Sequence, residues 1–193
     1  MKRICVFCGS SSGSEPAFAE AAREMGETLA RHHLGLVYGG GNIGLMGLLA
    51  DAVLTRGGEV VGVIPQALVD KELAHRGVTE LRVVRSMHER KALMADLADA
   101  FIALPGGFGT LDEFCEILTW AQLGLHRKPC GLLNVAGFYD PFLDQLNLAV
   151  AKRFIRAQHR ELVQVETTPD ALLRRLLAAH PPVMHKWIDR DQA

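Results

Sequence analysis

The most restrictive feature of this sequence is its regular alternation of short, mostly apolar runs with longer amphipathic segments. The first run spans residues 3–7, and the segment after it, residues 15–31, repeats apolar side chains at helical spacing. The runs that read as strands are 3–7, 34–38, 60–64, 80–84, 100–104 and 131–134. The helices predicted between and after them span 15–31, 43–55 and 170–179, and three more begin near Met87, Leu111 and Pro141.

Strands that are apolar throughout are buried on both faces of a sheet. Separated by helices, they predict an α/β fold: a doubly wound (Rossmann-like), mostly parallel sheet with helices on both faces. The length of 193 residues suits one nucleotide-binding domain, with a core over about residues 2–180 and a short C-terminal tail. Ligands of such sheets bind outside the carboxyl ends of the strands. The site is therefore expected in the loops 8–13, 39–44, 65–77 and 105–110.

The balance of charge excludes several classes of partner. With 21 Lys and Arg against 22 Asp and Glu the formal net charge is −1, so the chain lacks the field that holds nucleic acid. No apolar run approaches the ~18 residues of a membrane span, and the run near the N-terminus is too short for a signal-peptide core. The sequence predicts a cytoplasmic protein, without a nucleic-acid or membrane partner, that binds small ligands.

Four cysteines are present, of which Cys5 and Cys8 form a Cys-x-x-Cys pair. A redox or zinc site needs both thiols on one side of a turn, whereas residues three apart along a strand point to opposite faces. Cys115 and Cys130 supply no second pair, and the eight histidines show no metal-ligand spacing. We expect Cys5 and Cys8 to be buried, reduced thiols, and neither a metal nor a cofactor to be bound.

Two glycine clusters follow predicted strands. Residues 39–44 match Gly-x-Gly-x-x-Gly, but the next strand lacks the acidic residue that a dinucleotide site needs at its end, which disfavours NAD. Residues 105–110, Pro-Gly-Gly-Phe-Gly-Thr, open a helix, so their amides and the helix dipole predict a monophosphate site. No lysine follows them as in a Walker loop, and no Gly-x-Ser-x-Gly elbow is present, which disfavours that type of ATP hydrolysis and a serine hydrolase.

Glu113 admits two interpretations. Thr110 and Glu113 have the spacing of a capping box, in which the carboxylate bonds back to the backbone of Thr110. Alternatively, the carboxylate lies at the mouth of the anion site. Asp112 and Glu113 beside a phosphate then require an arginine or lysine nearby.

Arg90 is the best source of that positive charge. Ser86 and Glu89 form another capping box, so a helix begins here, and Arg90 takes a position in an apolar stripe that continues at Leu93 and Met94. The guanidinium either reaches solvent at the edge of the core or points into a pocket. An inward arginine requires an anionic partner, because an isolated buried charge is costly. Periodicity alone does not distinguish the two orientations.

These motifs resemble the LONELY GUY family. Residues 105–113 are similar to its Pro-Gly-Gly-x-Gly-Thr-x-x-Glu signature, and residues 87–91, Met-His-Glu-Arg-Lys, to its second motif. The opening 8–11, Cys-Gly-Ser-Ser, and the turn 38–41, Tyr-Gly-Gly-Gly, match its pattern too. The resemblance runs from about residue 2 to residue 180.

The resemblance implies a cytokinin riboside 5'-monophosphate phosphoribohydrolase, which hydrolyses the N-glycosidic bond of AMP and N6-substituted adenosine 5'-monophosphates to free base and ribose 5-phosphate. It also implies a homodimer with active sites near the subunit interface. By this likeness Arg90 and Glu113 are the catalytic pair. The substrate-binding residues that it implies are Gly9, Ser10, Gly40, Gly41, Glu72, Met87, Lys91, Gly106, Gly107, Phe108, Gly109, Thr110, Leu111, Asp112 and Thr119.

The chemistry of the residues agrees with this activity. Cleavage of an N-glycosidic bond builds positive charge on the sugar, and a carboxylate stabilises that charge or activates the attacking water. The alternatives are a non-catalytic nucleotide-binding carrier or sensor of the same fold and a hydride-transfer enzyme. A pyridoxal-phosphate lysine decarboxylase is disfavoured, because the six lysines show no Schiff-base constellation with an acidic partner.

Overall fold

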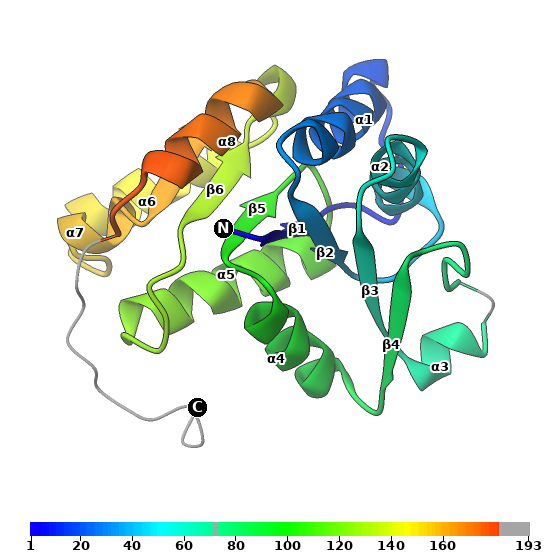
Figure 1. The fold of residues 1–193 in the computed structure, drawn as a ribbon. Coiled ribbons are helices and arrows are strands. Elements are labelled where there is room, and N and C mark those ends of the chain that lie inside the picture. The colour runs from blue at the N-terminus through cyan, green and yellow to red at the C-terminus, as the bar shows by residue number, and fades with distance from the viewer. Residues whose placement is uncertain (72, 182–193) are drawn as a thin grey trace.

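The computed structural model describes residues 1–71 and 73–181, and in this part of the chain seven strands form one sheet (Figure 1). The strand order is β4-β3-β2-β1-β5-β6-β7, and every neighbouring pair is parallel. The strands are β1 (Arg3–Phe7), β2 (Gly35–Tyr38), β3 (Val60–Pro65), β4 (Glu80–Val84), β5 (Ala100–Ala103), β6 (Cys130–Leu133) and β7 (Val163–Glu166). The predicted parallel α/β fold is confirmed.

Helices cover both faces of the sheet, with α1, α2 and α8 on one side and α4 and α5 on the other (Figure 1). The helices are α1 (Pro16–Arg31), α2 (Gly44–Thr55), α3 (Gln66–Val69), α4 (Met87–Leu97), α5 (Phe108–Gln122), α6 (Asp140–Ala151), α7 (Ala157–Arg160) and α8 (Pro169–Ala178), with a 3-10 turn η1 (Val135–Gly137). Among the described residues, no helix has both the length and the apolar character that a membrane span requires.

The two sides of the sheet build two separate cores, because successive side chains of a strand point to opposite faces. In β1, Ile4 and Val6 pack beneath α1 and α2, whereas Cys5 and Phe7 pack beneath α4 and α5. Cys8 joins the first core and Cys5 the second, and both are buried free thiols. The Cys-x-x-Cys pair is therefore divided between the cores, as the spacing predicts.

The order of the strands reverses between β1 and β5. From β1 the chain moves outward through β2, β3 and β4, and then returns to β5 on the other side of β1. The loops that leave β1 and β5 meet at this switch point, where Gly9 N–H donates to the Pro105 carbonyl at 3.1 Å. We call Gly9 and Gly106 the glycine crest. Clefts at such reversals are the usual ligand sites of open α/β sheets.

One strand and the start of one helix differ most from the sequence predictions. The strand β7 was not predicted, because three of its four residues are half-buried and two of them are the polar Gln164 and Glu166. Helix α5 begins at Phe108, with Gly107 as its N-cap, and not at Leu111. The earlier start places Gly107 at the N-cap and Gly109 in the first turn of the helix.

Close packing of α1 on α2 depends on Gly26. A Cβ atom at this position would lie 2.6 Å from the Leu49 carbonyl oxygen and 2.8 Å from the Cβ of Ala52. Gly26→Ala is therefore expected to destabilise the protein by about 1–3 kcal/mol through overpacking. Denaturant unfolding measures this loss. Glu24→Ala on the exposed side of the same helix should change stability by less than about 0.5 kcal/mol, and an equal effect of both variants would contradict the account.

Candidate active site

Helix α4 begins at the predicted cap. The Ser86 hydroxyl accepts from the Glu89 N–H at 3.1 Å. In a standard capping box the Glu89 carboxylate would accept from the N–H of the N-cap residue Ser86. Here it accepts from the N–H of the preceding residue, Arg85, at 2.8 Å. These bonds fix the first turn of α4, from which Arg90 projects.

Arg90 points into the protein. Its exposure is 8%, and its guanidinium donates in three directions. Nε donates to the Val63 carbonyl at 3.0 Å, Nη2 to the Gly39 carbonyl at 3.2 Å and Nη1 to Glu113 Oε1 at 2.7 Å. Of the two orientations that periodicity left open, the structure has the inward one, with the anionic partner that it requires.

Glu113 does not cap its helix. Gly107 is the N-cap of α5, and the Glu113 carboxylate, on a residue 7% exposed, accepts from Arg90. Burial raises the pKa of Glu113 from its usual value of 4.5, while the Arg90 guanidinium acts in the opposite direction. The charged partner that the second interpretation of Glu113 required is therefore present.

Gly39 leaves room for this ion pair. A Cβ atom at Gly39 would lie 1.9 Å from Arg90 Nη2, so any side chain here would displace the guanidinium. The glycine turn that follows is held from the other side: His75 N–H donates to the Gly40 carbonyl at 2.9 Å, and the His75 ring lies 2.9 Å from Asp51 Oδ1. Sequence reasoning missed His75, since a lone histidine in a loop carries no pattern.

The first turn of α5 presents open backbone. Leu111 N–H donates to the Gly107 carbonyl at 3.1 Å, so the amides of residues 108–110 lie at the free end of the helix. A Cβ atom at Gly107 or Gly109 would meet nothing within 4 Å, and neither glycine has a positive φ. Packing therefore does not require glycine at these two positions. Because glycine has no side chain, the amides of this turn stay accessible to an anion.

Gly106 differs from these two glycines. A Cβ atom at Gly106 would lie 2.2 Å from Thr110 Oγ1 and 2.9 Å from the Gly9 nitrogen. Thr110, which is buried, thus packs directly against the glycine crest. Glu113 lies three residues later, on the same face of α5 as Thr110.

A second set of charges joins α4 to α5 beside the first. Lys91 Nζ lies 3.2 Å from Asp112 Oδ2 and 3.0 Å from Glu116 Oε2. Burial lowers the pKa of Lys91, but the two carboxylates outweigh burial and raise it. Lys91 and Asp112 therefore lie next to the Arg90–Glu113 pair, as expected, but Lys91 is already ion-paired.

The structure places the remaining predicted residues in several regions. Gly9, Ser10, Gly40 and Gly41 lie in the loops at the carboxyl ends of β1 and β2, and Met87 and Phe108 are exposed. Glu72 lies outside the described residues. Thr119 is on α5, 11 residues or about 16 Å beyond Phe108 at the rise of a helix. It lines a different pocket of about 160 Å³ with Phe142 and Leu146, so the structure does not bring it to the Arg90–Glu113 pair.

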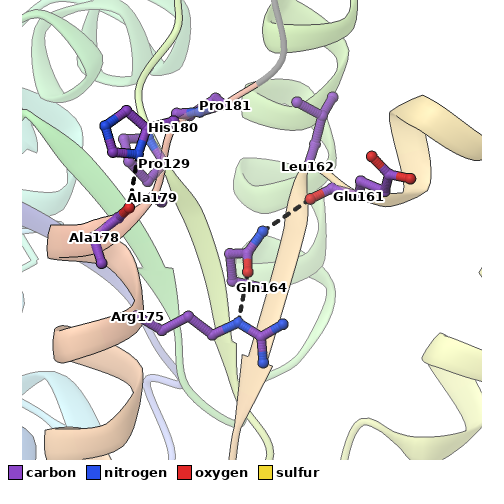
Figure 2. A pocket seen from close by; sticks show the side chains of 9 residues that line it. All are labelled: Pro129, Glu161, Leu162, Gln164, Arg175, Ala178, Ala179, His180 and Pro181. Atoms are coloured by element: carbon purple, nitrogen blue, oxygen red, sulfur yellow. Dashed lines mark hydrogen bonds between the residues drawn. The ribbon is translucent and has the colours of Figure 1, made fainter.

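A larger pocket of about 380 Å³ lies far from these residues, at the amino ends of β6 and β7 (Figure 2). Its polar side chains bond to one another: Arg175 Nε donates to Gln164 Oε1 at 2.6 Å, and Gln164 Nε2 donates to the Glu161 carbonyl at 2.9 Å. None of the predicted site residues lines it. Within the described ranges, no group of three or more His, Cys, Asp or Glu is placed to hold a metal.

The Glu113 carboxyl provides a direct test of this geometry. Carbon-detected NMR titration should give Glu113 a pKa above 4.5, because burial disfavours the charged form. In Arg90→Gln the pKa should rise further, because the guanidinium that stabilises the carboxylate is lost. Arg85→Gln, an exposed arginine just before α4, is the control and should leave the pKa unchanged. An unchanged Glu113 pKa in Arg90→Gln would contradict the ion pair.

Comparison with known proteins places the chain in a family. A family model described as "possible lysine decarboxylase" matches residues 46–176. The cytokinin riboside 5'-monophosphate phosphoribohydrolase LOG of Oryza sativa subsp. japonica is 52% identical over 175 residues, which are 91% of this chain and 72% of the relative. The Arabidopsis thaliana enzyme LOG7, of the same description, is 50% identical over 180 residues, 93% of this chain and 83% of the relative.

Among solved structures, a molybdenum cofactor binding protein from Rippkaea orientalis superimposes with a TM-score of 0.70 at 21% identity, over 92% of this chain and 97% of the other. At that identity the likeness shows the fold alone. The two plant relatives, by contrast, are about 50% identical over more than nine tenths of the chain. The chain therefore belongs to the LONELY GUY family of cytokinin riboside 5'-monophosphate phosphoribohydrolases.

Proposed function

We propose that this protein hydrolyses the N-glycosidic bond of N6-substituted adenosine 5'-monophosphates, releasing the free base and ribose 5-phosphate. The observation that carries the proposal is the buried Arg90–Glu113 pair, which lies next to the open first turn of α5. The two plant relatives are named for the same activity. We extend the proposal to AMP, which shares the phosphate, the sugar and the scissile bond.

The 5'-phosphate is proposed to lie at the start of α5. The amides of residues 108–110 and the positive end of the helix dipole favour an anion there, and Gly107 and Gly109 leave room for it. This placement sets the sugar over the glycine crest. Thr110 and Glu113 then face the sugar from the same side of the helix.

Glu113 is proposed to act on the anomeric carbon. Water adds to C1′ as the bond to the base nitrogen breaks; the bonding electron pair leaves with the base, which takes up a proton, while the water gives one up. Carboxylates promote such reactions by stabilising the positive charge on the sugar or by accepting that proton. The Val63 and Gly39 carbonyls fix the guanidinium of Arg90, which in turn holds Glu113 in place. The positive charge of Arg90 acts to lower the pKa of Glu113 and so favours its ionised form.

Two alternative functions, a nucleotide carrier or sensor and a decarboxylase, can be distinguished from the proposed hydrolase. A nucleotide carrier or sensor of the same fold would bind the phosphate at α5, yet a buried carboxylate beside that phosphate would only weaken its binding. A pyridoxal-phosphate decarboxylase, as the name of the family model suggests, needs a lysine free to form a Schiff base. Lys91, the residue after Arg90, forms ion pairs with Asp112 and Glu116.

The activity is tested by incubating the protein with AMP and with N6-isopentenyl AMP and separating the products. We expect both to yield free base and ribose 5-phosphate, and Glu113→Gln to lower the rate at least 100-fold, because the amide neither stabilises the sugar cation nor accepts a proton. Glu24→Gln, the same change on an exposed helix, is the control. A near-normal rate in Glu113→Gln would remove the proposed role, and no release from either nucleotide would favour the carrier.

We also propose that the protein is a homodimer. Helix α6 has no fully buried residue, and the apolar side chains of Leu148 and Phe154 in and after it are 50% and 88% exposed. Exposed apolar surface of this kind is typical of a contact between subunits.

Sedimentation equilibrium is expected to give twice the mass of one chain. Phe154→Asp should shift the mass toward the monomer, because a charge replaces an apolar contact. Arg153→Asp, next to it in sequence, is the control and should have a smaller effect. A monomeric wild-type protein would contradict the proposed dimer.

A further inference from the structure

The glycine turn after β2 has no side chains of its own to fix its shape. Gly39, Gly40 and Gly41 follow Tyr38, and glycine has the largest backbone freedom of any residue. Gly40 has a φ of +73°, a left-handed conformation that glycine adopts without strain. The Gly39 carbonyl is nevertheless placed to accept from Arg90 Nη2 at 3.2 Å. Contacts from outside the turn must therefore hold it.

The segment 73–77, in the connection between α3 and β4, supplies such contacts. The Asn42 N–H donates to the Leu73 carbonyl at 2.9 Å, and the His75 N–H donates to the Gly40 carbonyl at 2.9 Å. Between these two bonds the segment and the turn form an antiparallel bridge. The position of the turn therefore depends on the position of this segment.

The side chain of His75 ties the segment to α2. Its Nε2 lies 2.9 Å from Oδ1 of Asp51 on that helix, and its Nδ1 accepts from the Gly77 N–H at 3.1 Å. A ring nitrogen that accepts a hydrogen bond carries no proton, so the neutral ring has its proton on Nε2 and donates it to Asp51. The side chain of His75 is only 12% exposed, and both of its nitrogens are bonded.

Stability alone does not account for the bond between His75 and Asp51. The side chain of Asp51 is 65% exposed, and exposed pairs of this kind contribute little to the free energy of unfolding. Asp51 lies on the exposed side of α2, so losing the bond would leave the packing of α2 on α1 intact. What the bond does determine is where the segment 73–77 lies against the glycine turn.

We propose that His75 is a positioning residue for the Arg90–Glu113 pair. Held by Asp51, His75 fixes the glycine turn and so the Gly39 carbonyl to which Arg90 donates. The guanidinium then keeps the direction in which it meets Glu113. His75 acts through the turn and through Arg90. The inference rests on the proposed function only where catalysis is the readout.

The geometry is tested first without any substrate, by NMR titration of the Glu113 carboxyl. His75→Ala should raise the pKa of Glu113, because a guanidinium without its carbonyl partner in the turn stabilises the carboxylate less. The rise should be smaller than in Arg90→Gln, which removes the charge itself. His75→Gln, whose amide can still donate to Asp51, should restore most of the wild-type value. An unchanged Glu113 pKa in His75→Ala would overturn the proposal.

A second histidine–aspartate pair provides the matched control. Nε2 of His32, the C-cap residue of α1, lies 3.4 Å from Oδ1 of Asp170 on α8. His32→Ala removes this pair and should leave the pKa of Glu113 unchanged. Nitrogen chemical shifts of the wild-type protein should also show the proton of neutral His75 on Nε2, and a proton on Nδ1 would contradict the arrangement.

The kinetic test uses AMP as substrate and separates positioning from binding. His75→Ala should lower kcat about 10- to 100-fold, the loss expected when reacting groups are displaced by about 1 Å, and should change KM little. Asp51→Ala should cause the same loss, and the double variant no further loss, because the two residues act as one unit. Asp51→Asn keeps an oxygen that accepts from Nε2 and should restore most of the rate.

The outcomes distinguish this proposal from the proposed function. Additive losses in the double variant, or an effect on KM alone, would overturn the role of His75 even where hydrolysis is established. If the wild-type protein hydrolyses neither AMP nor N6-isopentenyl AMP, the proposed function fails. The titration of Glu113 in His75→Ala then still decides whether His75 positions the ion pair.

Discussion

The ion pair between Arg90 and Glu113 constrains the rest of this structure, because burying two charges costs several kcal/mol per ion unless their hydrogen-bonding capacity is met. Here it is met by groups from three separate parts of the fold: strand β3, the loop after β2 and helix α5. The Val63 and Gly39 carbonyls take two of the directions of the guanidinium, and Glu113 takes the third. Removal of either charged partner would leave the other buried alone, at a cost of about 3–5 kcal/mol.

The same pair links the architecture of the sheet to its chemistry. Arg90 comes from the helix after β4 and Glu113 from the helix after β5, so the pair joins segments on both sides of the strand reversal. It thereby holds the first turn of α5 close to the glycine crest. A buried ion pair and the free amides of α5 come together there, although Arg90 and α5 lie apart in the sequence.

Much of the fold followed from the sequence, but the pairing of side chains did not. Apolar runs predicted six of the strands, although β4 at one edge contains the charged Glu80 and Arg82. The strand at the other edge, β7, was missed: it is four residues long and half of them are polar. The spacing of Thr110 and Glu113 fits a capping box equally well, and only the tertiary contact with Arg90, 23 residues away, decides between the two roles. Thr119 was assigned to the site by the family resemblance; within this chain it lines another pocket, and its role stays a prediction. The site roles carried by family resemblance remain predictions.

The central claim is that the nucleotide lies across the glycine crest with its sugar at Glu113. A crystal structure of Glu113→Gln with N6-isopentenyl AMP tests it most directly, since the variant should retain the bound nucleotide. We expect phosphate oxygens within hydrogen-bond distance of the amides of residues 108–110, and C1′ next to the side chain of residue 113. A phosphate bound elsewhere, for example beside Arg175 in the pocket of Figure 2, or a C1′ remote from residue 113, would contradict it.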